Sequence, residues 1–199
     1  ALSSAASDVY KRQVLLSVYY NESPYYFRLS IDSIFDQSLQ PAEVVLVKDG
    51  ELTPELDNVI TEYTAKYLQF RVVTLKWNQG LGKALNEGLK HCSYDLVARM
   101  DTDDIAMPDR LEKEGAYMEA HPEVDVVGGA IREFNDEGTI DRVKNMPKTQ
   151  EEILEYVKVR NPLNHMTVMY RKDSILKAGN YKHFPFLEDY SLWSRMLSQ

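Results

Sequence analysis

Short apolar runs alternate with helical patterns along the first hundred residues. Four mostly apolar runs of five or six residues are typical of buried strands, and they cover residues 14–18, 43–47, 71–75 and 95–100. Between these runs, apolar side chains recur at the spacing of one helix face: Phe27, Ile31, Ile34 and Phe35, then Leu56, Ile60, Tyr63 and Tyr67, then Leu81, Ala84, Leu85 and Leu89. The pattern βαβαβαβ predicts an α/β fold with a Rossmann-like, mostly parallel sheet and helices on both of its faces.

The second half of the chain is less regular. Pro108 indicates the start of a helix that runs to about Ala120, and Thr149 with Glu152 forms a capping box before another helix. Residues 124–127 and 166–170 read as strands, and residues 190–197 form an amphipathic segment without a terminating signal. We therefore expect the natural protein to continue beyond this segment.

Residues 1–13 are small and polar, and they lack the apolar centre of a signal peptide. We expect them to be a disordered leader or an appended segment. Residues 14–199 are long enough, and with 44% hydrophobic residues in the chain apolar enough, to form one domain. No apolar run approaches the 18 residues of a membrane span.

The charge of the chain limits its partners. The formal net charge is -8, and no basic face is visible in the sequence, which weighs against nucleic-acid binding. An acidic protein that handles anions must bind them locally, through a metal ion, a helix N-terminus or a few placed cations. Cys92 is the only cysteine, so no disulfide can form within the chain, as expected in a reducing compartment.

Polar residues gather where each of the four predicted strands ends. They lie at residues 19–22, 48–50, 77–80 and 101–104. Ligands of an open parallel sheet bind outside the carboxyl ends of its strands, so we expect these segments to line one edge. The last of them carries Asp101, Asp103 and Asp104 within four positions, although like charges repel and are costly to desolvate.

Four interpretations of this acidic cluster are open from the residues alone. A calcium loop is disfavoured because Ile105 and Ala106 stand where an oxygen ligand and a glycine are needed. A phosphotransferase with an aspartate nucleophile is disfavoured because Ile105 replaces the usual Thr or Val, and because that pattern normally follows the first strand. A divalent cation that bridges a nucleotide diphosphate fits two carboxylates at i and i+2 after a strand. The simplest reading is a solvated turn in which Asp104 caps the next helix.

Six motifs in order along the chain decide between these interpretations: SVYYNES, EVVLVKDG, NQGLGKALNEGL, ARMDTDD, VGG and FLEDYSLW. Together they closely resemble the family 2 glycosyltransferases, which have the GT-A fold, and especially the bacterial enzymes of exopolysaccharide and lipopolysaccharide biosynthesis. The resemblance runs from Val14 to the last residue. It implies a metal-dependent, inverting transfer of one sugar from a nucleotide-diphosphate donor, a UDP-sugar, to an acceptor hydroxyl.

The resemblance also assigns the nucleotide site. It implies that Val18, Tyr19 and Glu22 flank the base, and that Asp49 accepts a hydrogen bond from the uracil. Lys83 stands where a basic residue of the family reaches the nucleotide or the diphosphate. The chain departs from the family in two places: the usual proline before Val18 is missing, and a lysine replaces the first of two aspartates before Gly50.

Metal and catalytic roles follow in the same way. The resemblance implies that Asp101 and Asp103 bind Mn²⁺ or Mg²⁺, with Asp101 and Thr102 also at the nucleotide. Glu188 and Asp189 match the family's catalytic pair, in which Asp189 is the general base.

Other roles stay open. His165 either serves the diphosphate side of the site or is a buried, hydrogen-bonded histidine. The implied acceptor is a saccharide or a lipid-linked saccharide, met in the cytoplasm or at the inner face of the plasma membrane, where peripheral association is possible in principle. A non-catalytic nucleotide-sugar-binding or scaffold domain is the alternative.

Overall fold

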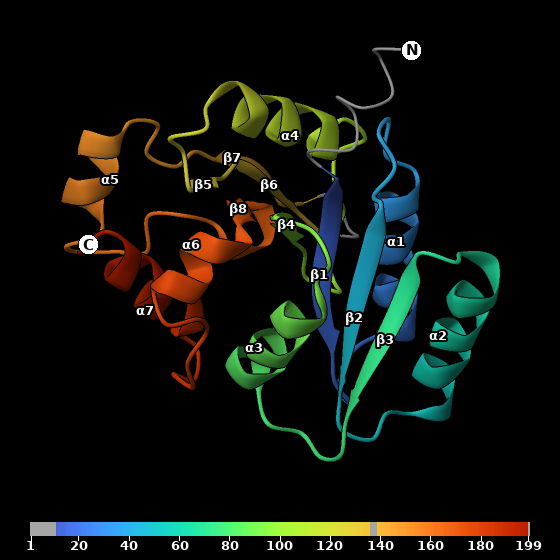
Figure 1. The fold of residues 1–199 in the computed structure, drawn as a ribbon. Coiled ribbons are helices and arrows are strands. Elements are labelled where there is room, and N and C mark those ends of the chain that lie inside the picture. The colour runs from blue at the N-terminus through green and yellow to red at the C-terminus, as the bar shows by residue number, and fades with distance from the viewer. Residues whose placement is uncertain (1–10, 136–138, 199) are drawn as a thin grey trace, which may run out of the picture.

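The computed structural model describes residues 11–135 and 139–198 and contains one large twisted sheet with helices on both sides (Figure 1). Its strands lie in the order β3-β2-β1-β4-β8-β5, with bounds β1 (Arg12–Val18), β2 (Glu43–Asp49), β3 (Phe70–Leu75), β4 (Leu96–Arg99), β8 (Met169–Arg171) and β5 (Val126–Val127). Strands β1 to β4 are parallel, β8 is antiparallel to β4, and β5 is antiparallel to β8. The predicted mostly parallel sheet is confirmed.

Seven α-helices are found in the described residues: α1 (Pro24–Phe35), α2 (Pro54–Lys66), α3 (Leu81–His91), α4 (Arg110–Ala120), α5 (Gln150–Tyr156), α6 (Lys172–Lys177) and α7 (Glu188–Met196). The Ser23 and Thr53 side chains accept hydrogen bonds from the first turns of α1 and α2, which both begin with proline. The predicted capping box of Thr149 and Glu152 starts α5. None of the described helices is both long and apolar enough to cross a membrane.

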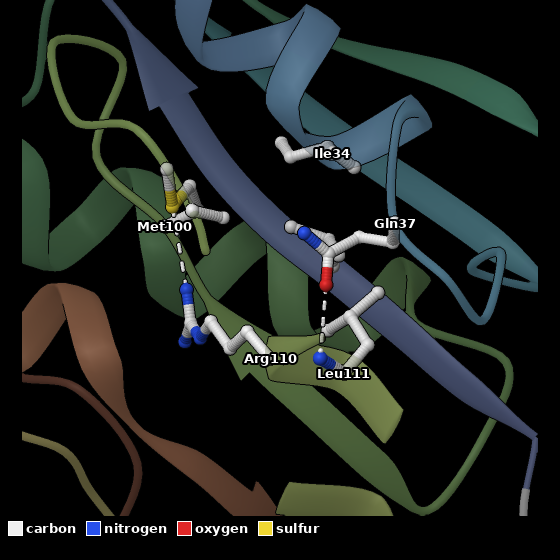
Figure 2. A pocket seen from close by; sticks show the side chains of 7 residues that line it. Ile34, Gln37, Met100, Arg110 and Leu111 are labelled. Atoms are coloured by element: carbon white, nitrogen blue, oxygen red, sulfur yellow. Dashed lines mark hydrogen bonds between the residues drawn. The ribbon is translucent and has the colours of Figure 1, made fainter. Parts of the chain in front are cut away.

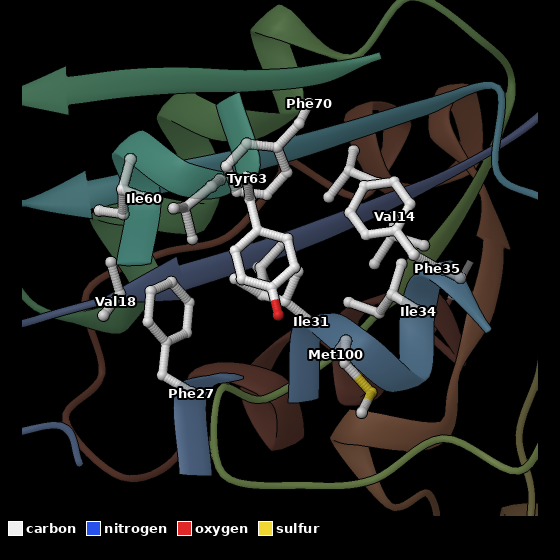
Figure 3. Close-up of a cluster of buried hydrophobic side chains, with 14 of the residues drawn as sticks. Val14, Val18, Phe27, Ile31, Ile34, Phe35, Ile60, Tyr63, Phe70 and Met100 are labelled. Atoms are coloured by element: carbon white, nitrogen blue, oxygen red, sulfur yellow. The ribbon is translucent and has the colours of Figure 1, made fainter. Parts of the chain in front are cut away.

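Alternating residues of the strands build two separate cores. Val14, Leu16 and Val18 of β1 face the core that α1, α2 and α4 cover, which Figure 3 shows in part. Leu15 of the same strand faces the other core, covered by α3, α6 and α7, in which Trp193 is 1% exposed. Because successive side chains of a strand point to opposite faces, runs that are apolar throughout are buried on both sides.

The strand order places a crevice at the carboxyl edge of the sheet. β1 lies between β2 and β4, and the register pairs Val18 with Lys48 and Leu15 with Arg99. The chain runs outward from β1 to β2 and β3, with α1 and α2 on one face, and then returns through α3 on the other face to β4, on the far side of β1. Such a switch point is where open α/β sheets bind their ligands.

The start of α4 differs from the prediction. The helix begins at Arg110 instead of Pro108, and its N-cap, Asp109, makes no side-chain capping bond. Gln37, two residues after the end of α1, explains this, because its side-chain amide donates to the carbonyl of Met107 at 2.8 Å and accepts from the amide of Leu111 at 3.0 Å. Gln37 thus fixes the chain on both sides of residues 108 and 109. Asp104 does not cap the helix, contrary to the simplest reading of the acidic cluster.

A small pocket of about 10 Å³ lies where α1 and the segment after it pack against the start of α4 (Figure 2). It is lined by Val14, Ile34, Gln37, Met100, Ala106, Arg110 and Leu111. That volume corresponds to a single water-sized probe, so this pocket is a packing gap and not a ligand site.

Other boundaries also differ from the sequence prediction. β1 begins at Arg12, so residues 12 and 13 of the expected leader belong to the sheet, while residues 1–10 lie outside the described residues. The strand expected at 166–170 is preceded by a short 3-10 turn, His165–Thr167, and pairs only over Met169–Arg171. An antiparallel hairpin, β6 (Ile131–Phe134) with β7 (Asp141–Lys144), was not predicted.

Glu114 on α4 yields a first testable prediction. It is paired with Arg110, yet burial raises its pKa to about 7. Glu114 therefore binds a proton more tightly in the folded protein than in the unfolded chain. The stabilisation that this proton gives is present at low pH and is lost as the pH rises from about 4.5 to 7. The difference in the free energy of unfolding between Glu114→Gln and wild type should therefore shift in favour of the variant by about 1–3 kcal/mol from pH 5 to pH 8.

Urea unfolding at both pH values measures this gain. Glu151→Gln, an exposed carboxylate on α5, is the matched control and should parallel the wild type. An unchanged difference between Glu114→Gln and wild type at the two pH values would show that Glu114 is not the titrating group.

Candidate active site

A pocket of about 420 Å³ lies at the carboxyl edge of the sheet, within the usual size range of small-molecule sites. The loops after β1, β2, β3 and β4 and the segment before α7 form its walls. Its lining residues are Ser17, Tyr19, Glu22, Asp49, Asn78, Gly80, Leu81, Asp101, Thr102, His183, Pro185, Phe186 and Glu188. The four polar segments expected at one edge thus do contribute to one site, although not every residue of each segment reaches it.

The pocket is strongly acidic. Four carboxylates line it, from Glu22, Asp49, Asp101 and Glu188, whereas His183 is the only basic side chain among the described lining residues. An anionic ligand in this pocket meets net repulsion unless a cation accompanies it.

The acidic loop after β4 is held by polar side chains of α1. Ser30 donates to the carbonyl of Asp101 at 2.7 Å, and the hydroxyl of Ser33 accepts from the amide of Ala106 at 3.0 Å. Ser30 and Ser33 lie three positions apart on one face of α1, and Gln37, just after the helix, continues this polar stripe. The hydrogen bonds of this stripe go to the backbone of the loop and not to its carboxylates.

Two carboxyl groups at this loop, those of Asp104 and Glu22, have raised pKa values. Burial, then Asp101 and Asp103, raise the pKa of Asp104 to about 6. Burial and, next, the charge of Asp103 raise the pKa of Glu22 across the pocket. The nearby charge of Arg99 lowers both pKa values, but it does not offset burial and the neighbouring carboxylates.

This donor set fits a hard divalent cation. All the side-chain groups of the acidic loop are oxygen ligands, which Mg²⁺ and Mn²⁺ prefer. In residues 11–135 and 139–198, no three His, Cys, Asp or Glu side chains are arranged to hold a metal ion by themselves. A cation bound through one or two carboxylates and completed by substrate phosphates matches this arrangement.

Asp49 stabilises the loop before α3. It is 3% exposed, and its two carboxylate oxygens accept from the backbone amides of Gln79, at 2.8 Å, and Gly80, at 3.0 Å. Each oxygen has a further lone pair, so Asp49 can still accept from a ligand in the pocket that it lines. The structural and the ligand-binding interpretations of Asp49 are compatible.

Three residues of the predicted nucleotide site differ in their position relative to the pocket. Tyr19 lines the pocket, but Val18 is fully buried in the core because the strand alternation turns it there with Leu16. The Val18 side chain therefore does not face the pocket, and a contact between its backbone and the base stays a prediction. Lys83 is exposed on the first turn of α3 and is not among the lining residues.

Glu188 and Asp189 begin α7. Glu188 is 8% exposed and lines the pocket. Asp189 does not line it; its carboxylate accepts from the Asn161 amide at 2.5 Å and from the backbone amide of Tyr190 at 2.7 Å. Burial raises the pKa of Asp189, while these hydrogen bonds act in the opposite direction. A half-buried carboxylate with a raised pKa is chemically suited to accept a proton.

Residues 182–187, called the 182–187 loop below, form a wall of the pocket that was not predicted from the sequence. His183, Pro185 and Phe186 of this loop line the pocket. Phe186 is 96% exposed and has a φ of 67°, a conformation that bulky residues rarely adopt. The two phenylalanines of this loop, Phe184 and Phe186, were the only available sequence signal.

His165 is not part of the pocket. It is 9% exposed, its Nε2 lies 3.0 Å from the hydroxyl of Tyr181, and its ring packs edge-on against Trp193. Burial lowers its pKa well below the usual value, so the ring is neutral. The structure supports the buried histidine over the diphosphate contact.

Gly82 of α3 packs closely against Lys182 and Glu188. A Cβ at this position would lie 2.4 Å from the carbonyl oxygen of Lys182 and 2.8 Å from Cγ of Glu188. Asn86, one turn later, donates to the carbonyl of Tyr181 at 2.8 Å. This close approach brings the 182–187 loop and Glu188 to the pocket.

Gly82→Ala should therefore lower the free energy of unfolding by about 1–3 kcal/mol, because the backbone carbonyl cannot move aside without displacing the loop. Gly129→Ala is the matched control, since its Cβ would meet only ordinary contacts, at 3.8 Å. Urea unfolding of both variants measures the difference. Equal stability of the two variants would contradict the close packing at Gly82.

Comparison with known proteins identifies relatives over nearly the whole chain. The signature of "Glycosyl transferase family 2" matches residues 15–182. The amylovoran biosynthesis glycosyltransferase AmsE of Erwinia amylovora is 44% identical, over 93% of this chain and 69% of its own. A UDP-Gal:alpha-D-GlcNAc-diphosphoundecaprenol beta-1,3-galactosyltransferase of Escherichia coli is 36% identical, over 97% of this chain and 70% of its own.

Solved structures share the fold. TarS 1-349 of S. aureus, in complex with UDP-GlcNAc, superposes with a TM-score of 0.73 at 21% identity over 94% of this chain. The mannosyltransferase PcManGT of Pyrobaculum calidifontis, in complex with GDP-Man and Mn²⁺, gives 0.71 at 17% identity over 94% of this chain. The chain spans about half the length of these two, 53% and 51%. The GT-A fold expected from the sequence is confirmed, and the chain belongs to glycosyl transferase family 2.

Proposed function

We propose that this protein is a metal-dependent, inverting glycosyltransferase that moves one sugar from a UDP-sugar to an acceptor hydroxyl in cell-surface polysaccharide synthesis. The acidic pocket carries this proposal. Four carboxylates and a single histidine line it, so a nucleotide diphosphate requires a cation to bind there. The family match and a relative named for amylovoran biosynthesis support the reaction class and the pathway.

Asp101 and Asp103 would hold Mn²⁺ or Mg²⁺, and the bound ion would supply the charge that stabilises the departing diphosphate. The acceptor oxygen attacks the anomeric carbon while the bond from that carbon to the diphosphate breaks. Asp189 accepts the hydroxyl proton during attack, a role that its raised pKa favours. Attack from the side opposite the leaving group inverts the anomeric centre.

Tyr19, Glu22, Asp49 and Thr102 bind the nucleotide in this proposal, because all four line the same pocket. Lys83 reaches the diphosphate from the first turn of α3. The acceptor is a saccharide or a lipid-linked saccharide, as in the name of the Escherichia coli relative. The reaction then takes place in the cytoplasm, at the inner face of the plasma membrane.

A donor panel tests the proposed function. The full-length protein is incubated with UDP-, GDP- and dTDP-sugars and acceptor, with Mn²⁺ or with EDTA, and nucleotide release is measured. We expect release from a UDP-sugar that depends on Mn²⁺. Equal release with EDTA would reject the metal dependence, and release from a GDP- or dTDP-sugar alone would reject the UDP donor. Nucleotide binding without release would favour a non-catalytic binding domain.

A further inference from the structure

We propose that Arg99 is a positioning residue that holds Asp101 in the orientation in which this aspartate binds the cation of the donor complex. Arg99 is the last residue of β4, and its side chain is 0% exposed. Its Nη2 donates to Oδ1 of Asp101, two residues further along the chain. The inference rests on the proposed function, because that function makes Asp101 a metal ligand.

The burial of Arg99 is costly. Its Nε and Nη1 groups are buried and have no hydrogen-bond acceptor in the described protein. Buried donors without a partner lower stability, and replacing a buried ion pair by apolar side chains is often neutral or stabilising. Stability therefore does not account for an arginine here. Residues that break a local rule in this way concentrate at functional sites.

The backbone beneath Arg99 is fixed on both sides. Its amide donates to the carbonyl of Val168 at 2.8 Å, and its carbonyl accepts from Nη2 of Arg110 at 2.8 Å. Arg110 is in turn paired with Glu114, with a closest distance of 3.1 Å. The guanidinium of Arg99 therefore extends from an anchored strand end.

Asp101 is fixed from two directions. Ser30 holds its backbone carbonyl, and Arg99 holds Oδ1 of its carboxylate. The described residues give Oδ2 no hydrogen bond, and Asp101 lines the pocket. One oxygen of Asp101 is thus oriented by protein contacts, and the other stays available to a ligand.

Two roles of Arg99 make opposite predictions about cation binding. If Arg99 only supplied positive charge, its removal would strengthen the binding of a divalent cation, because like charges repel. If it orients Asp101, its loss weakens that binding, and substitutions of residues that orient metal ligands typically cost about 10–100-fold. Lysine keeps the charge but lacks the planar fork of donors. Arg99→Lys and Arg99→Met together therefore separate the two roles.

The experiment measures the dissociation constant of UDP by calorimetry, with saturating Mn²⁺ and with EDTA. The EDTA constant divided by the Mn²⁺ constant gives the factor by which Mn²⁺ strengthens UDP binding, and this ratio is the readout. We expect both variants to reduce this ratio about 10–100-fold and to leave the EDTA value unchanged. Thermal unfolding of the metal-free proteins verifies that the variants fold, and Arg99→Lys decides the matter if Arg99→Met does not fold.

Two controls complete the test. Arg171→Met removes another mostly buried arginine, on β8, whose guanidinium donates to the carbonyls of Met118 and Val124, and it should keep the wild-type ratio. In an Asp101→Asn background, Arg99→Lys should have no further effect on the ratio. A wild-type ratio in Arg99→Lys, or a larger ratio in Arg99→Met, would overturn the inference. A wild-type protein without any Mn²⁺ effect would reject the proposed function instead.

Discussion

Asp189→Asn is expected to reduce sugar transfer by about 10²–10⁴-fold, the usual contribution of a general base, and to leave binding of UDP unchanged. The asparagine amide has nearly the shape of the carboxylate but cannot accept the acceptor's proton. Its oxygen can still accept the hydrogen bond of Asn161, so the start of α7 should remain intact. Initial rates with the best donor of the panel, together with UDP titrations, measure the two effects.

Asp173→Asn is the matched control for this variant. Asp173 also lies in the first turn of a helix, α6, but it is exposed and outside the pocket. It should keep wild-type rates. If Asp189→Asn retains full transfer, the base is a different group, and Glu188 is then the first candidate because it lines the pocket.

Asp103→Asn should remove most of the tightening that Mn²⁺ gives to UDP binding, by about 10²-fold or more, since only one of the two proposed carboxylate ligands remains. Asp103 is exposed, so the substitution should not affect the fold. Loss of its charge should also lower the raised pKa of Glu22, to which it contributes. UDP titrations with Mn²⁺ and with EDTA give the size of the effect.

The control for Asp103 is Asp109→Asn. Asp109 is near the same loop and pairs with Lys113, but it makes no capping bond and does not line the pocket. It should keep the Mn²⁺ effect in full. A wild-type Mn²⁺ effect in Asp103→Asn would remove this residue from the proposed metal site.

The first half of the fold was predictable because its signals are local. Each buried strand is a short apolar run, and Ser23 and Thr53 mark the starts of two helices. The direction of β8 was not predictable, because three paired residues carry no sign of the strand's orientation. The β6–β7 hairpin was missed since ion pairs between exposed side chains, such as Arg132 with Asp141, replace the apolar pattern of a strand.

The candidate site also combines residues that were predicted from the sequence with residues that were not. Glu22, Asp49 and Asp101 were found because they follow strands whose carboxyl ends share one edge. The 182–187 loop was not found, because it has no regular structure and reaches the pocket through tertiary contacts such as the close approach at Gly82. Arg99 read simply as the end of a strand, since its burial depends on tertiary packing that no local pattern records.

Calorimetric titration of the wild-type protein with UDP, in the presence of Mn²⁺ and of EDTA, tests the central claim most directly. The acidic pocket predicts tight binding with Mn²⁺ and binding at least about 10²-fold weaker with EDTA, since the diphosphate then meets uncompensated carboxylates. Equal affinity under the two conditions would contradict the account, because the pocket would then accept an anion without the cation that its residues require.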